Sequence, residues 1–250
     1  MEEELYVQVK KHKDRLILQQ PIFQSLSDFL QVNFGYDVLC CGYYRKRMKS
    51  LPSYVINRLD IYSADNASFS KMREDGFTQN LHGVTAPKVE QTLDYIKKLI
   101  VDHRVPQRFP FYRNPKIYST LHLKVNEKLI IETNRLFVMS HSFEQAYREF
   151  SLTNQSKSIV NLINSTFPSL PIYRVLINFG SIFVFFQTDA DKEKYDLDGT
   201  SEEIRNVCFY YLKEKDEYGL YREKHHVPFQ TDSDEKVKKE FEGSYFYYFK

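Results

Sequence analysis

The chain has 250 residues, a length that allows one large domain or two small ones. Hydrophobic residues make up 42% of the sequence and charged residues 27%, which argues against a chain that is disordered throughout. The formal net charge of +2 is too small to indicate a polyanion as the partner of the whole protein.

The cysteines and the first residues favour a cytoplasmic location. Cys40, Cys41 and Cys208 form no even-numbered disulfide framework and no Cys-x-x-Cys zinc spacing, so we expect a reducing compartment. The first residues are acidic and lack the basic and apolar regions of a signal peptide. The longest apolar runs, such as Ile182–Phe186, are far too short to span a bilayer, so we expect no membrane association.

The first half of the chain predicts strands and helices in alternation. Leu5, Val7 and Val9 alternate with polar residues, which is typical of a strand, and Pro87 suits the first turn of a helix. In chain order we expect a hairpin over 5–18, a helix over 25–34, strands over 36–39 and 55–62, and a helix over 85–100.

The second half predicts a similar series. Ile182–Phe186 runs without a polar residue and is expected in the middle of a sheet, while Thr200 and Glu203 predict a capping box. In chain order we expect a hairpin over 121–131, a helix over 158–167, strands over 173–176 and 182–186, a helix from 200, and a last strand over 245–249.

The two halves repeat the order ββαββα, which predicts an α+β fold of two related units. Each unit would be a mainly antiparallel sheet covered by two helices. Apolar positions coincide when the halves are aligned, for example Leu26 with Ile159 and Leu30 with Ile163. The offset between the halves drifts, so convergent patterning is the alternative to a duplication. Prolines and basic residues over 104–115 predict a linker, which gives units 1–110 and 111–250.

A basic stretch with two tyrosines is the first candidate binding site. Its cations could contact phosphates while the rings stack on bases, or it could bind an acidic protein, or it could be a solvated turn. The residues are Tyr43, Tyr44, Arg45, Lys46, Arg47 and Lys49.

Four carboxylates in an acidic stretch form the second candidate site. They are Asp189, Asp191, Asp196 and Asp198. Gly180-Ser181 before two carboxylates resembles the metal-binding order of nucleotidyltransferases, but there a helix begins at the Gly-Ser, whereas here a strand is expected. The alternative is a hairpin turn followed by an acidic helix start, which could face a basic partner.

Other catalytic patterns receive little support. The spacing around Gly199 places Lys194 and Arg205 where a calcium loop needs carboxylates. A nucleophile pair of Cys41 with His82 or His141 has no local support. No phosphate-binding glycine motif is present, so we expect no cofactor and assign no catalytic or metal-binding residue.

The sequence therefore favours a binding protein over an enzyme. With 19 tyrosines and 20 phenylalanines, some rings are expected at the surface, where they suit protein contacts. We expect a non-catalytic, intracellular protein-binding module of the immunity or inhibitor type, which neutralises a partner by steric and electrostatic occlusion. The first alternative is a metal-dependent phosphoryl-transfer or nuclease-like enzyme that uses Asp189 and Asp191. The second is a nucleic-acid-binding accessory protein that uses residues 45–49.

Overall fold

The computed structural model describes residues 3–47, 55–77, 86–103, 118–119, 131 and 136–250. The chain divides into two compact units, Met1–Ala146 and Tyr147–Lys250. Each unit combines a mixed β-sheet with helices. The expected α+β class, with two similar sheet-and-helix units, is therefore confirmed.

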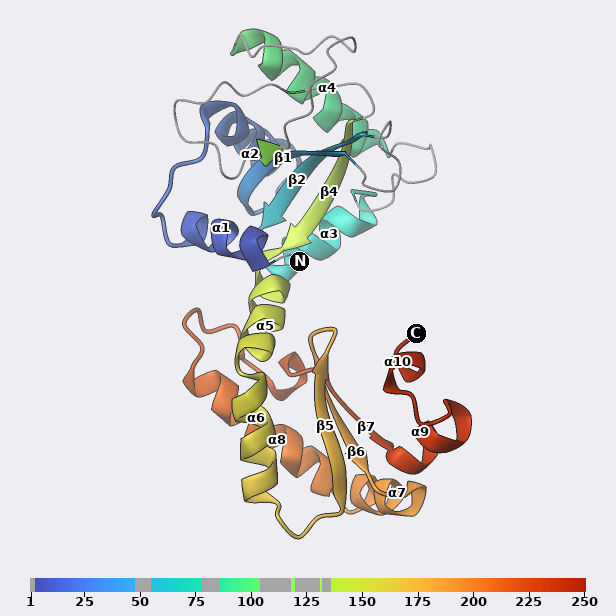
Figure 1. Cartoon of the computed structure of the whole chain (residues 1–250). Helices are drawn as coiled ribbons and strands as arrows, with labels where there is room; N and C mark the ends of the chain where they lie inside the picture. Colours follow the sequence, from blue (N-terminus) through green and yellow to red (C-terminus); the bar gives the residue numbers. More distant parts are fainter. Residues whose placement is uncertain (1–2, 48–54, 78–85, 104–117, 120–130, 132–135) are drawn as a thin grey trace. The chain divides into compact units, whose positions relative to one another are not determined.

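The first unit contains a four-stranded sheet with the strand order β3-β1-β2-β4 (Figure 1). Strand β1 is antiparallel to β2 and to β3, whereas β2 and β4 are parallel. The elements are α1 (Glu3–Lys13), α2 (Pro21–Phe34), β1 (Val38–Arg47), β2 (Val55–Ser63), α3 (Asn66–Glu74), α4 (Pro87–Asp102), β3 (Tyr118–Ser119) and β4 (Leu136–Ser142).

The core of the first unit lies between the sheet and helices α2 and α4. Leu26 and Leu30 of α2 are four residues apart and therefore share one face of the helix. They form one apolar cluster with Leu59 of β2 and with Ile96 and Ile100 of α4. The helices expected over 25–34 and 85–100 are thus confirmed, each with its apolar stripe buried.

The second unit contains a three-stranded sheet with the order β5-β6-β7. In Figure 1, α6 and α8 lie on one side of this sheet, and α9 and α10 lie on the other. Helix α5 (Phe143–Asn154) begins in the first unit and ends in the second. The remaining elements are α6 (Ser156–Thr166), β5 (Ile172–Asn178), β6 (Ser181–Phe186), α7 (Asp189–Leu197), α8 (Thr200–Glu214), the 3₁₀-helix η3 (Lys224–His226), β7 (Phe229–Ser233), α9 (Asp234–Glu240) and α10 (Tyr245–Tyr248).

Strand β6 is the middle strand of this sheet, as its unbroken apolar run predicts. It is antiparallel to β5 and parallel to β7. Phe179 and Gly180 join β5 to β6, and both have positive φ angles, 49° and 68°. Positive φ at both central residues is typical of a two-residue hairpin turn, so the expected tight turn is present one residue earlier than Gly180-Ser181.

Both units follow the same order of elements around their sheets. A helix leads into an antiparallel hairpin, two helices follow, and a later strand pairs in parallel with the second hairpin strand. The first unit has the short strand β3 in addition, between the second of these helices and the parallel strand. In the first unit these elements are α2, β1, β2, α3, α4 and β4. In the second they are α6, β5, β6, α7, α8 and β7.

A pair of serines makes the same contacts in the two units. Ser142 ends β4 and Ser233 ends β7, and each side chain accepts a hydrogen bond from the backbone amide three residues later. Each hydroxyl also donates to the first residue of the helix after the hairpin, Ser142 to Asn66 and Ser233 to Asp189. The shared plan therefore extends from the order of elements to individual hydrogen bonds.

The hairpin predicted over 5–18 is wrong, because Glu3–Lys13 forms helix α1. Tyr6 and Val9 are three residues apart and buried, whereas Val7 is exposed, so burial follows the helical period. The matching hairpin predicted over 121–131 lies almost wholly outside the described residues.

Two expectations near the end of the chain are also wrong. The last strand predicted over 245–249 is helix α10, whose start is capped by the Ser244 side chain, and the third strand of the sheet is β7. The helix predicted from Thr200 is present as α8, but its N-cap is Gly199, which has no side chain to form a cap. The predicted capping box is therefore not formed.

The observed division of the chain differs from the expected boundary between residues 110 and 111. Strand β4 pairs with β2 along its whole length, which ties residues 136–142 to the first sheet. Residues 104–117 lie outside the described part of the chain, so the linker there stays a prediction.

Candidate functional site

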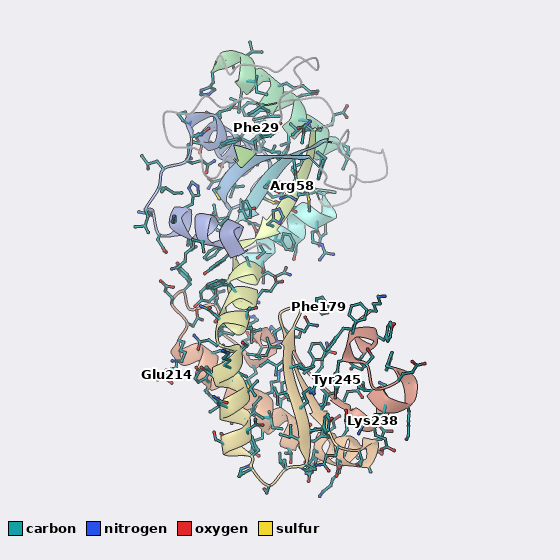
Figure 2. All side chains as sticks on the ribbon, viewed as in Figure 1. Phe29, Arg58, Phe179, Glu214, Lys238 and Tyr245 are labelled. Carbon is teal, nitrogen blue, oxygen red and sulfur yellow. The ribbon has the colours of Figure 1, made fainter. Side chains whose placement is uncertain are left out.

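A groove in the second unit lies between β5 and the C-terminal segment. Its volume is about 490 Å³. In Figure 2 the labelled side chains of Phe179 and Tyr245 lie between the β5–β6 hairpin and the C-terminal helices. The lining residues that carry the argument below are Arg174, Leu176, Phe179, Tyr245, Phe246 and Phe249.

The C-terminal wall of the groove is held in place by two tyrosine hydroxyls. Tyr245 donates to Asp234 at 2.8 Å, and Tyr248 donates to Asp232 at 2.7 Å. Both aspartates are buried, and burial together with these hydrogen bonds raises the pKa of each phenol. The α10 segment is therefore anchored by polar contacts at the sheet edge.

Aromatic packing completes the anchor. Phe183 and Phe185 of β6 form the apolar cluster on which the C-terminal segment lies. Tyr245 and Phe249 meet these rings edge to face, with centroids 4.8 Å apart for Phe185–Tyr245 and for Phe183–Phe249. Such pairs add about 0.5–1.5 kcal/mol beyond the area that they bury. This wall of the groove is thus preformed.

Two large rings in the groove are exposed to solvent. Phe179 has 75% of its surface exposed and Phe246 has 68%. Phe179 also has φ 49°, a left-handed conformation that is strained for a bulky residue. Strained residues are common at functional sites, where surrounding structure holds them in place. The Phe179 side chain is therefore exposed to solvent, and its backbone conformation is energetically unfavourable.

The charged groups of the groove are cationic. The Arg174 guanidinium lies 4.7 Å from the Tyr245 ring centroid, and the Lys250 ammonium lies 4.9 Å from that of Phe246. No aspartate or glutamate belongs to the described lining of the groove. An anionic ligand would therefore meet complementary charge here.

The Arg174 side chain contacts the described residues through its ring-facing guanidinium and not through hydrogen bonds. Its guanidinium donates no hydrogen bond to any residue in the described part of the chain. Asp234, the nearby carboxylate, is instead paired with Lys238 at 2.6 Å. Burial alone would raise the pKa of Asp234, but hydrogen bonds from Lys238 and Tyr245 hold that pKa below its usual value. The N–H donors of the Arg174 guanidinium therefore remain available to a ligand.

The structure corrects one residue of the predicted basic site. Tyr43 has only 2% of its surface exposed, and its hydroxyl donates to Asn57 at 3.0 Å inside the core of the first unit. It cannot contact a partner from there. Tyr44, Arg45, Lys46 and Arg47 belong to β1, but their side chains lie outside the described set, as does the whole of Lys49. A role for these residues stays a prediction.

The predicted acidic residues bind the ends of helices in the second unit. Asp189 accepts from Ser233 and faces Lys239, and Asp191 accepts from Thr188 at 2.6 Å. Hydrogen bonding from Ser233, supported by Lys239, lowers the pKa of Asp189. These bonds lie around the starts of α7 and α9 and do not belong to the groove lining.

Asp196 and Asp198 have similar local partners. Asp196 accepts from Ser201 at 2.5 Å and from Thr231 at 2.9 Å, which joins α7 to α8 and to β7. Asp198 accepts from the Thr200 amide at 2.9 Å. Among the described residues, no group of three or more histidine, cysteine, aspartate or glutamate side chains could hold a metal ion.

The suggested pair of Cys41 with His141 is not formed. Cys41 of β1 pairs with Ile61 of β2, and His141 of β4 pairs with Tyr62 of β2. Because Ile61 and Tyr62 are neighbours on one strand, the side chains of Cys41 and His141 lie on opposite faces of the sheet. Burial raises the pKa of the Cys41 thiol to about 12. His82 lies outside the described residues.

A buried ionic cluster in the first unit escaped the sequence reasoning. Asp60 of β2 lies 2.7 Å from the Arg58 Nε atom and 2.8 Å from His141 Nε2 of β4. Tyr62 stacks on His141, with centroids 4.8 Å apart. Strand alternation in the sequence puts Arg58, Asp60 and Tyr62 on one face of a strand. The sequence does not show that β4, which carries His141, pairs with this strand; the structure shows it.

Comparison with protein-family models, with curated proteins and with solved structures gives no match. No helix in the described part of the chain is long and apolar enough to cross a membrane.

Proposed function

We propose that this chain is a non-catalytic protein-binding module whose second unit takes an apolar, acidic segment of another protein into the β5–α10 groove. The observation that carries the proposal is the combination of exposed rings with Arg174, for which no described residue serves as a hydrogen-bond acceptor. Aromatic residues and arginine are the residue types that dominate binding energy at protein interfaces.

The exposed rings supply an apolar driving force. Full burial of a phenylalanine contributes about 1.5–3 kcal/mol, and Phe179 and Phe246 are both far from buried in the chain alone. The anchored C-terminal wall lowers the ordering cost of binding, because little of it has to become fixed. The groove therefore suits a segment with large apolar side chains.

The inhibitor form of the proposal adds one requirement. If the bound segment belongs to the working surface of the partner, the second unit blocks that surface sterically and by charge complementarity. An immunity-type protein acts in this way. Its cytoplasmic location is part of the same proposal and is consistent with three cysteines that are all free.

The groove supports binding better than phosphoryl transfer. Asp189 and Asp191 make local hydrogen bonds to Ser233 and Thr188, and no described third ligand joins them. The nucleic-acid alternative depends on residues 44–49, whose side chains are not described. Binding through the groove is the function for which specific contacts can be named.

Photo-crosslinking identifies the partner and tests the site. A benzoylphenylalanine at position 179 should crosslink one protein, and the same group at the exposed Leu197 should not. The identified partner is then purified and titrated by calorimetry. Phe179→Ala with Phe246→Ala should weaken binding at least about tenfold, which corresponds to 1.4 kcal/mol.

A matched double variant controls for the loss of exposed apolar surface. Leu197→Ala with Tyr210→Ala removes two exposed side chains outside the groove and should leave the affinity unchanged. Equal affinity of the groove variant and the wild type would remove the groove from the function. A partner whose own activity is unaffected by saturating binding would exclude the inhibitor form alone.

A further inference from the structure

Among the strands that the structure describes, none lies along the outer edge of β5. Strand β5 is the terminal strand in the order β5-β6-β7, and four of its residues line the groove: Arg174, Leu176, Ile177 and Asn178. Asn178 and Ser181 flank the two-residue turn and pair directly. In an antiparallel ladder, hydrogen-bonded and non-hydrogen-bonded pairs alternate from that point. The amide and carbonyl groups of Val175 and Ile177 therefore point away from β6.

These outward groups have no partner in the described part of the chain. Of the described strands, β6 alone pairs with β5, and neither Val175 nor Ile177 forms a backbone hydrogen bond with any other described residue. An exposed strand edge is a template for another extended chain. Extended peptides commonly bind by adding a strand to such an edge.

The side chains of β5 add a charge preference to the edge. Arg174 and Leu176 are two residues apart on the strand, so they share the face that lines the groove. A guanidinium presents five N–H donors in a fixed fork that fits a carboxylate through two parallel bonds. The Arg174 guanidinium lies over the Tyr245 ring and donates no hydrogen bond to a described residue.

We infer that the ligand of the groove is an extended peptide segment that pairs with the outer edge of β5 and places a carboxylate side chain on Arg174. The inference rests on the proposed protein-binding function and names the class of ligand. Because side chains alternate along a strand, the residue two positions from the carboxylate faces Leu176 and the exposed Phe179. The expected motif is therefore an acidic residue, any residue, and a large apolar residue, in either chain direction.

Selection from a random decapeptide display library on the wild-type protein provides the probe. The expected result is enrichment of an acidic residue two positions from a large apolar one. Enrichment of apolar residues without an acidic partner would overturn the role of Arg174. A library that yields no enriched motif would overturn the inference as a whole.

The carboxylate contact is tested with the selected peptide, fluorescently labelled, and its acid-to-amide analogue. Arg174→Gln and Arg174→Lys should each weaken binding at least about tenfold, because lysine keeps the charge but loses the fork. The amide analogue should bind the wild type equally weakly and should lose nothing further on Arg174→Gln. Additive losses in this double-mutant cycle would show that the two groups do not meet.

Strand pairing is tested by removing single N–H groups. Ile177→Pro deletes an amide that bonds to no described residue, and proline is tolerated on edge strands. It should weaken peptide binding at least about tenfold with an unchanged melting temperature. If that variant misfolds, N-methylation of alternate peptide amides serves on the wild-type protein, and one of the two alternating sets should abolish binding.

The outcomes separate the inference from the function on which it rests. Binding that depends on Phe179 and Phe246 but resists both Ile177→Pro and N-methylation would leave the protein-binding function standing and would overturn strand pairing. Loss of dependence on Phe179 and Phe246 themselves would instead overturn the proposed function.

Discussion

His141 Nε2 on β4 lies 2.8 Å from Oδ1 of Asp60 on β2, across the parallel pair of strands that closes the first sheet. Asp60 has only 2% of its surface exposed, and Arg58 approaches the same oxygen at 2.7 Å. A buried carboxylate must be paired, because an unpaired charge in the interior is strongly unfavourable. The contact of Asp60 with His141 therefore links β2 to β4 through polar side chains.

Asp60→Asn should lower the free energy of unfolding by about 3 kcal/mol, because breaking one partner of a buried ion pair leaves the others uncompensated. Urea denaturation followed by circular dichroism measures the change. Asp94→Asn is the matched control, since Asp94 is exposed and pairs with Lys97 at 2.8 Å on the surface. The control should stay within about 0.5 kcal/mol of the wild type. Similar losses in the two variants would contradict a special role of the buried cluster.

The three cysteines should be unreactive in the folded protein. All three are buried, and burial raises the pKa of the Cys41 and Cys208 thiols to about 12. At pH 8 only about one in 10⁴ such thiols is ionised, and the thiolate is the reactive form. Ellman's reagent should therefore report no fast-reacting thiol before denaturation and three afterwards. One thiol that reacts within seconds in the native protein would argue against this burial.

Ser142→Ala and Ser233→Ala should each lower stability by about 1 kcal/mol, as loss of a helix cap typically does. Ser165→Ala is the control, because that exposed hydroxyl bonds to a carbonyl of its own helix. Chemical denaturation measures all three variants. Equal stability of the wild type and both cap variants would show that the repeated serine contact contributes nothing.

The Ser233 effect should also depend on pH. The hydrogen bond from Ser233 lowers the pKa of Asp189 in the folded state. Its stabilisation is therefore present above the ordinary pKa of aspartate and is lost as the pH falls through the lowered folded-state value. The difference between the wild type and Ser233→Ala should shrink from neutral pH to strongly acidic pH. A difference that grows on acidification would reverse this assignment.

Gly180→Ala should destabilise the hairpin that carries Phe179. Gly180 has φ 68°, and an added Cβ atom would lie 2.7 Å from Glu149 Cγ. Gly219→Ala is matched, because Gly219 has φ 66° with no atom within 4 Å of an added Cβ. Gly219→Ala should lower the free energy of unfolding by about 1–2 kcal/mol, the cost of the backbone strain alone. Gly180→Ala should lower it by more. Glu149→Ala in the Gly180→Ala background should remove the excess, whereas an excess that persists would place its cause elsewhere.

Sequence periodicity by itself determined the elements that bury an apolar stripe. Leu26 with Leu30, and Ile159 with Ile163, recur at helical spacing, and the unbroken run from Ile182 to Phe186 indicated a central strand. Local pattern suffices there because the same face of each element meets the core. It failed at 5–18 and 245–249, where short apolar runs fit a strand or a helix equally well and contacts decide between them.

Only the tertiary structure decided where the candidate site lies. Arg174 and Tyr245 are far apart in the chain, and they meet because α9 and α10 fold back onto the sheet through Asp232 and Asp234. The same folding placed Asp189 beside Ser233 and buried Tyr43 against Asn57. Composition predicts that some charges and rings reach the surface, but which of them remain without a partner depends on contacts between distant residues.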